Sequence, residues 1–120
     1  MKSVFAACAG ALSLCACVSL PQRDSLDKPA SITHESRKPP RQVADCIAAE
    51  WRKARVVGSE LAVDVVPQGA GLRVTMKVGG ALSRVAQIDA QGTGSGTQLW
   101  NLSMDFGATA PPVLAVRDCQ

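Results

Sequence analysis

Residues 60–78 read ELAVDVVPQGAGLRVTMKV, and this stretch decides the fold of the chain. Apolar residues recur at every second position in 60–66 and again in 72–78, which is the period of a β-strand with one buried face. The residues between them, PQGAG at 67–71, have the chemistry of a hairpin loop. The two strands are therefore predicted to pair antiparallel.

Two further strands are expected towards the C-terminus. Residues 84–90 form a weaker pattern, with Ala86 and Ile88 on one face. Residues 98–106 form a clearer one, with Trp100, Leu102, Met104 and Phe106 on one face. Glycines punctuate the chain at 79–80 and 92–96. This order predicts an antiparallel meander.

An amphipathic helix is predicted before the first strand, because apolar residues recur there at spacings of three and four. They are Val43, Ile47, Trp51 and Ala54, flanked by Cys46 and Val57. Pro40 suits the first turn and Gly58 suits the end of such a helix. Residues 113–116 suggest a short strand or helical turn. The predicted fold class is α+β: one N-terminal helix packed on a three- to four-stranded antiparallel sheet.

The five cysteines fall into two groups. Cys8, Cys15 and Cys17 lie in the first twenty residues, which leaves Cys46 and Cys119 in the region of the predicted elements. In an oxidising compartment this pair is expected to form one disulfide that joins the helix to the end of the chain. A zinc site is not expected, because two cysteines and one distant histidine supply too few ligands.

The N-terminus has the features of a secretory signal: Lys2, an uncharged run over 3–20, and small residues. Within it, Leu14-Cys15-Ala16-Cys17 resembles the lipobox of bacterial lipoproteins. That resemblance implies lipidation of Cys17, and Val18 after it implies sorting to the outer membrane of a Gram-negative cell. Two alternatives stay open: a box at 12–15 ending in Cys15, and an uncleaved membrane span.

The chain therefore divides into a signal peptide at 1–16, a lipidated N-terminus with a disordered tether at 17–40, and a small α+β domain at 41–120. The tether is rich in proline, serine and charge, and it holds the single histidine, His34, away from any expected pocket. The basic residues Arg37, Lys38 and Arg41 suggest either a solvated linker or contact with anionic headgroups or peptidoglycan.

No catalytic residue, cofactor, metal or small-molecule substrate is predicted. The run GTGSG at 92–96 lacks the Lys-Ser/Thr of a P-loop, and Ser95 has no nucleophile-elbow context. The acids are scattered in the sequence; they include Asp64, Asp89, Asp105 and Asp118. A net charge of +3, spread along the chain, does not indicate nucleic-acid binding.

The layout of the whole chain resembles the small proteobacterial lipoproteins without an assigned activity. It has the lipobox, a polar tether, a Cys-Ile-x-x-x-Trp helix at 46–51 and a terminal Arg-Asp-Cys at 117–119. A looser resemblance is to outer-membrane assembly lipoproteins with helices on a three-stranded sheet, from which this chain departs in having one predicted helix. The first resemblance implies attachment to the membrane through a lipid anchor.

Two functions are compatible with these features. The first is a non-catalytic accessory or binding module of the cell envelope, which contacts a protein partner through a sheet edge or polar face. The second is a periplasmic inhibitor or protective binding protein directed at a cell-wall hydrolase or another envelope factor. An inhibitor usually presents a charged, protruding loop, and the candidate loops at 68–71 and 91–96 are nearly uncharged.

Overall fold

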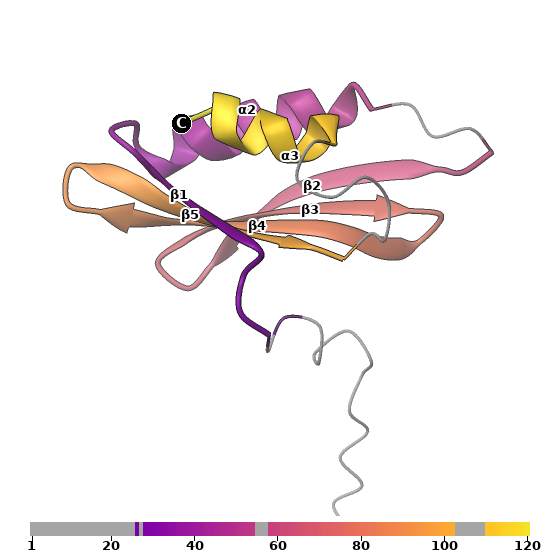
Figure 1. Ribbon diagram of the computed structural model, residues 1–120, viewed down its shortest axis with the longest axis horizontal. Coiled ribbons are helices and arrows are strands. Elements are labelled where there is room, and N and C mark those ends of the chain that lie inside the picture. Colours follow the sequence, from indigo (N-terminus) through magenta and orange to yellow (C-terminus); the bar gives the residue numbers. More distant parts are fainter. Residues whose placement is uncertain (1–25, 27, 55–57, 103–109) are drawn as a thin grey trace, which may run out of the picture.

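The computed structural model describes residues 26, 28–54, 58–102 and 110–120. The elements in chain order are β1 (Ile32–Ser36), α2 (Pro40–Arg52), β2 (Leu61–Gln68), β3 (Gly71–Val78), β4 (Ala81–Gln91), β5 (Gly94–Asn101) and α3 (Pro111–Asp118). The strands form one antiparallel sheet in the order β1-β5-β4-β3-β2, and both helices cover the same face of it (Figure 1). The α+β class is confirmed, with five strands and two helices in the described residues rather than three or four strands and one helix.

The β2–β3 hairpin is the part of the fold that the sequence predicts best. Its register runs from Leu61 opposite Val78 to Gln68 opposite Gly71, which extends both strands into the predicted loop. Only Gly69 and Ala70 remain in the turn. Gly69 has a φ of 58°, a left-handed conformation that glycine adopts without steric cost.

Strand β1 corrects the prediction of a tether that extends to Pro40. Residues Ile32–Ser36 pair with β5, and the register places His34 opposite Thr97. The segment contains a single large apolar side chain, Ile32, so its sequence shows no period of two. Its pairing with β5 rests on backbone hydrogen bonds. Gly94 allows the approach, since a Cβ there would collide with the backbone of Ser36 and Arg37.

Strand β5 begins earlier than predicted and buries the other set of side chains. Ser95, Thr97 and Leu99 face the core, whereas Trp100 is half-buried on the opposite face, so the predicted apolar face is wrong at this position. The buried hydroxyls have partners: Ser95 donates to the carbonyl of Lys38 at 2.8 Å, and Thr97 bonds the side chain of Gln120 at 3.4 Å. Met104 and Phe106 lie outside the described residues.

The core lies between the sheet and the helices. The predicted helical positions Val43, Ile47 and Trp51 are fully buried there with the sheet residues Val74, Met76, Ala86, Ile88 and Leu99. Helix α2 ends at Arg52, before the predicted stop at Gly58. At the C-terminus, residues 113–116 belong to a helix, α3, and Val113 and Val116 add to the core.

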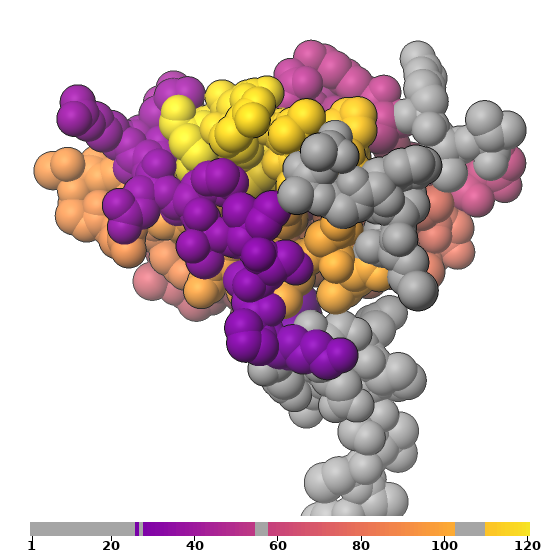
Figure 2. Space-filling view, in the orientation of Figure 1, coloured from indigo at the N-terminus to yellow at the C-terminus, as the bar shows by residue number. Residues whose placement is uncertain are grey.

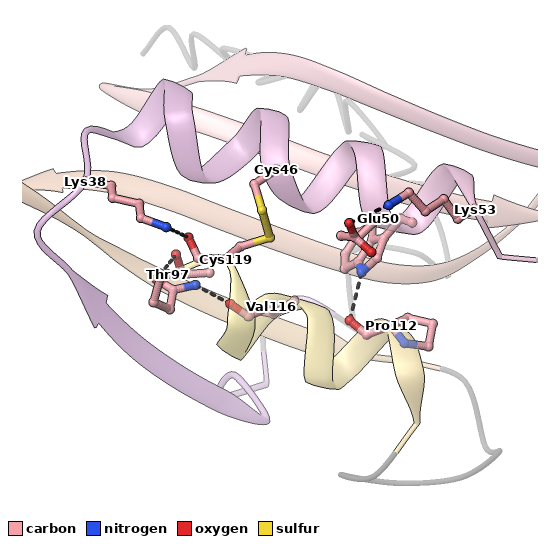
Figure 3. Close-up of a disulfide and its surroundings, with 10 residues drawn as sticks. Lys38, Cys46, Glu50, Lys53, Thr97, Pro112, Val116 and Cys119 are labelled. Atoms are coloured by element: carbon pink, nitrogen blue, oxygen red, sulfur yellow. Dashed lines mark hydrogen bonds and ion pairs between the residues drawn. A yellow bond between two sulfur atoms is a disulfide. The ribbon is translucent and has the colours of Figure 1, made fainter.

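Two links hold α3 beside α2. The predicted disulfide joins Cys46 to Cys119, with a Cα–Cα distance of 5.8 Å (Figure 3). The indole nitrogen of Trp51 donates to the carbonyl oxygen of Pro112 at 2.9 Å. Pro112 lies in the first turn of α3 and Cys119 directly follows its last residue, so the terminal helix is fixed at its two ends.

Candidate functional site

Strand β2 forms the free edge of the sheet. Among the described residues it pairs only with β3, whereas the other edge is formed by β1. The amide of Gly79 donates to the carbonyl of Glu60 at 2.8 Å, which fixes the phase of the β2–β3 ladder. Because ladder groups alternate in direction along a strand, the backbone groups of Leu61, Val63 and Val65 point away from the sheet.

The side chains of β2 divide between two surfaces. Leu61, Val63 and Val65 are half-buried against the core, on the side that α2 covers. On the helix-free side, Ala62, Asp64 and Val66 are exposed, and Glu60 just before the strand is exposed as well. Val66 is 42% exposed, the only exposed large apolar side chain in the described parts of the chain. The edge therefore has an apolar side and an acidic side.

Two features limit pairing at this edge. Arg52, the last residue of α2, donates from its guanidinium to the carbonyl of Val63 at 3.4 Å. Pro67 occupies an edge-pointing position and has no amide hydrogen to offer. Such features are typical of edge strands that must avoid indiscriminate pairing. Among the described residues, the outward amides of Leu61, Val63 and Val65 have no hydrogen-bond acceptor.

A polar hollow of about 580 Å³ lies over β1, β5 and β4, in the half of the sheet away from the β2 edge. Glu35 and Asp89 stand opposite Gly96 from its two neighbouring strands, and the side chain of Gln91 lies over that glycine. His34 also lines the hollow. Within residues 26, 28–54, 58–102 and 110–120, no three histidine, cysteine or acidic side chains are placed to hold a metal.

Ser95 lies under this part of the sheet and is not available as a nucleophile. Its side chain is 1% exposed, and its hydroxyl donates to a backbone carbonyl of the segment before α2. The glycine-rich run that contains it is mainly strand: only Gly92 and Thr93 form the turn between β4 and β5. The residues 92–96 therefore do not form a phosphate-binding loop.

The remaining residues singled out in the sequence are dispersed. Lys38 donates from Nζ to the carbonyl of Cys119 at 3.3 Å (Figure 3). Arg41 pairs with Asp45 at 3.2 Å, so the basic cluster is divided between two different contacts. Asp118 pairs with Arg117 on α3 at 2.9 Å. Asp105 and the predicted lipidation site Cys17 lie outside the described residues.

The segment before β1 reaches the helix-free face of the sheet. The indole nitrogen of Trp100 donates to the carbonyl of Lys28 at 2.9 Å. Figures 1 and 2 show this segment, in indigo, leaving the domain on the side away from the helices. The chain thus enters the sheet at β1, the edge opposite β2.

Comparisons of the chain with protein-family models, with curated proteins and with solved structures find no match. The described helices are all too short or too polar to cross a membrane. Sequence reasoning identified exposed sheet edges in general, but the free edge is defined only once β1 is known to occupy the other one.

Proposed function

We propose that the chain is a lipid-anchored binding module of the Gram-negative cell envelope, without catalytic activity, which presents the β2 edge to a protein partner. The observation that carries the proposal is the opposition of the two sheet edges: the N-terminal segment enters at β1, and the free strand is β2. With strands about 4.8 Å apart, four spacings separate the edges by about 19 Å. Anchoring through Cys17 therefore leaves β2 free of the point of attachment.

The accessory role is favoured over the inhibitor role by the shape of the hairpins. The turns of β2–β3, β3–β4 and β4–β5 each leave two residues between the paired strands. Turns this short do not provide the protruding loop with which an inhibitor enters an active site. The contact surface of the described chain is a strand edge, which suits a stable protein assembly.

The test is metabolic labelling with radioactive palmitate, combined with separation of inner and outer membranes. Cys17→Ser is compared with Cys15→Ser, which removes the cysteine of the alternative box. We expect the parent chain and Cys15→Ser to carry label and to sediment with the outer membrane, because acyl chains provide the anchor. Cys17→Ser should lose both properties. Retention of label and membrane association in Cys17→Ser would reject the proposal.

A further inference from the structure

We propose that the β2 edge binds an extended segment of a partner protein in which apolar residues alternate with lysine or arginine, by adding it as a sixth strand. This inference rests on the proposed function, because it assigns the partner chemistry of that binding module. Strand addition uses main-chain hydrogen bonds for affinity and alternate side chains for specificity. The β2 edge provides both.

The backbone of β2 supplies the main-chain hydrogen bonds. The amides and carbonyls of Leu61 and Val65 point outward, as does the amide of Val63, and they follow the spacing of an antiparallel or parallel partner. Pro67 ends the series, because it has no amide hydrogen. The accessible length therefore matches a segment of about five to seven residues, a usual length for a strand.

The side chains on the helix-covered side of β2 supply apolar contacts. Leu61, Val63 and Val65 are half-buried, so their outer surfaces lie open at the edge beside the fully buried Val74 and Met76. Every second residue of an added strand would lie directly beside these three side chains. Burial of apolar surface would stabilise apolar residues there, as it does across any sheet.

The side chains on the helix-free side of β2 supply charge selectivity. Glu60 and Asp64 are exposed on the helix-free side, and neither forms an ion pair in the described chain. Side chains of an added strand would lie about 5 Å from these carboxylates. Arg73 and Lys77 lie on β3, diagonal to Asp64 on the other side of β2, so they would be two strand spacings from the added side chains. At about 10 Å, physiological salt screens much of their effect. Lysine or arginine is therefore favoured in the positions facing the carboxylates.

A second copy of the chain is a poorer occupant of the same edge. An antiparallel β2–β2 pair centred on Val63 would place Asp64 diagonally across from Asp64 of the other copy. Like charges on neighbouring strands are destabilising. Arg52 would also have to leave the carbonyl of Val63 in both copies, rather than in one.

The experiment measures binding of a fluorescent seven-residue peptide of alternating valine and lysine to the full chain, purified in a neutral detergent, by fluorescence anisotropy. A valine–glutamate peptide of the same length is the charge control. A third peptide carries the valine–lysine sequence with N-methyl groups on the amides of one edge. We expect the valine–lysine peptide to bind at least tenfold more tightly than either control.

Variants of the chain locate the binding. Val63→Pro removes the outward amide and no ladder hydrogen bond, and Val63→Ala is its matched control because it keeps the amide. The pair Glu60→Gln with Asp64→Asn removes the carboxylates, whereas Glu35→Gln removes an exposed carboxylate at the opposite edge of the sheet. Val63→Pro should abolish binding, and the double amide variant should weaken it about three- to tenfold, as expected for two exposed charge pairs.

Three results would overturn the inference: equal binding of the lysine and glutamate peptides, unchanged binding of the N-methylated peptide, or binding that is insensitive to Val63→Pro in a chain of unchanged circular dichroism. A dimer in sedimentation that dissociates on Val63→Pro, without peptide binding, would assign the edge to a second copy. These assays do not depend on the lipid, so their failure is distinguishable from failure of the proposed anchoring at Cys17.

Discussion

Loss of the Cys46–Cys119 disulfide should remove a large share of the stability of the domain. The bond joins residues 73 positions apart, and α3 lies at its far end. For a loop of 73 residues, the chain-entropy relation gives a loss of about 4.4 kcal/mol when the link is absent from the unfolded state. Small domains have about 5–15 kcal/mol in total, so the cross-link decides whether the fold persists on heating.

The measurement is thermal and urea unfolding by circular dichroism, on a chain that starts at Val18 and so contains only this pair of cysteines. The oxidised chain is compared with Cys46→Ala/Cys119→Ala and with the reduced parent. We expect the double variant and the reduced parent to melt about 20–30 °C below the oxidised chain, at about 4–8 °C per kcal/mol for a domain of this size. The slope of the unfolding free energy against urea concentration should rise, because the unfolded chain becomes more expanded.

Reducing agent should leave the double variant unchanged, which separates loss of the bond from other effects of the reductant. The double variant also loses the buried sulfur of Cys119, which is 1% exposed, and it should therefore be slightly less stable than the reduced parent. A reduced parent within about 1 kcal/mol of the oxidised chain would refute the reasoning, since the loop entropy would then be absent.

Three further substitutions test separate contacts. Trp51→Phe removes the hydrogen bond to Pro112 and should lower the free energy of unfolding by about 1–3 kcal/mol in urea titrations; an unchanged value would exclude that contact. Gly94→Ala should displace β1 and lower the melting temperature clearly, whereas Gly96→Ala meets only a flexible side chain; equal melting temperatures would contradict the pairing of β1. Arg52→Gln frees the carbonyl of Val63 and removes a cation, so it should tighten binding of the valine–lysine peptide two- to fivefold in anisotropy titrations, and weaker binding would count against the edge.

The elements that the sequence predicts correctly are those whose burial follows a simple period. Val43, Ile47 and Trp51 repeat along one helical stripe, and Val74 and Met76 alternate along a strand with one buried face. In both cases the hydrophobic effect alone selects the inward side chains, so the pattern is visible without knowledge of the neighbours.

The elements that the sequence misplaces depend on partners far along the chain. Ser95 and Thr97 face the core because Lys38 and Gln120 satisfy their hydroxyls, and no local pattern contains that information. β1 pairs through its backbone, and its sequence contains only one large apolar residue, Ile32, so no apolar pattern marks it as a strand. The free edge could not be assigned to β2 until β1 was placed, so the position of the candidate site depended on the strand with the weakest pattern.

Site-specific photo-crosslinking in the native cells tests most directly whether an anchored domain offers β2 to a partner. A photoreactive residue replaces Ala62 on β2, which lies between the two carboxylates, in one strain and Asp118 on α3 in another, and adducts are identified by mass spectrometry. The predicted result is an adduct with one envelope protein from position 62, lost on Val63→Pro and on Cys17→Ser. An adduct that forms equally from position 118, or that persists in Val63→Pro, would contradict a function carried by the β2 edge.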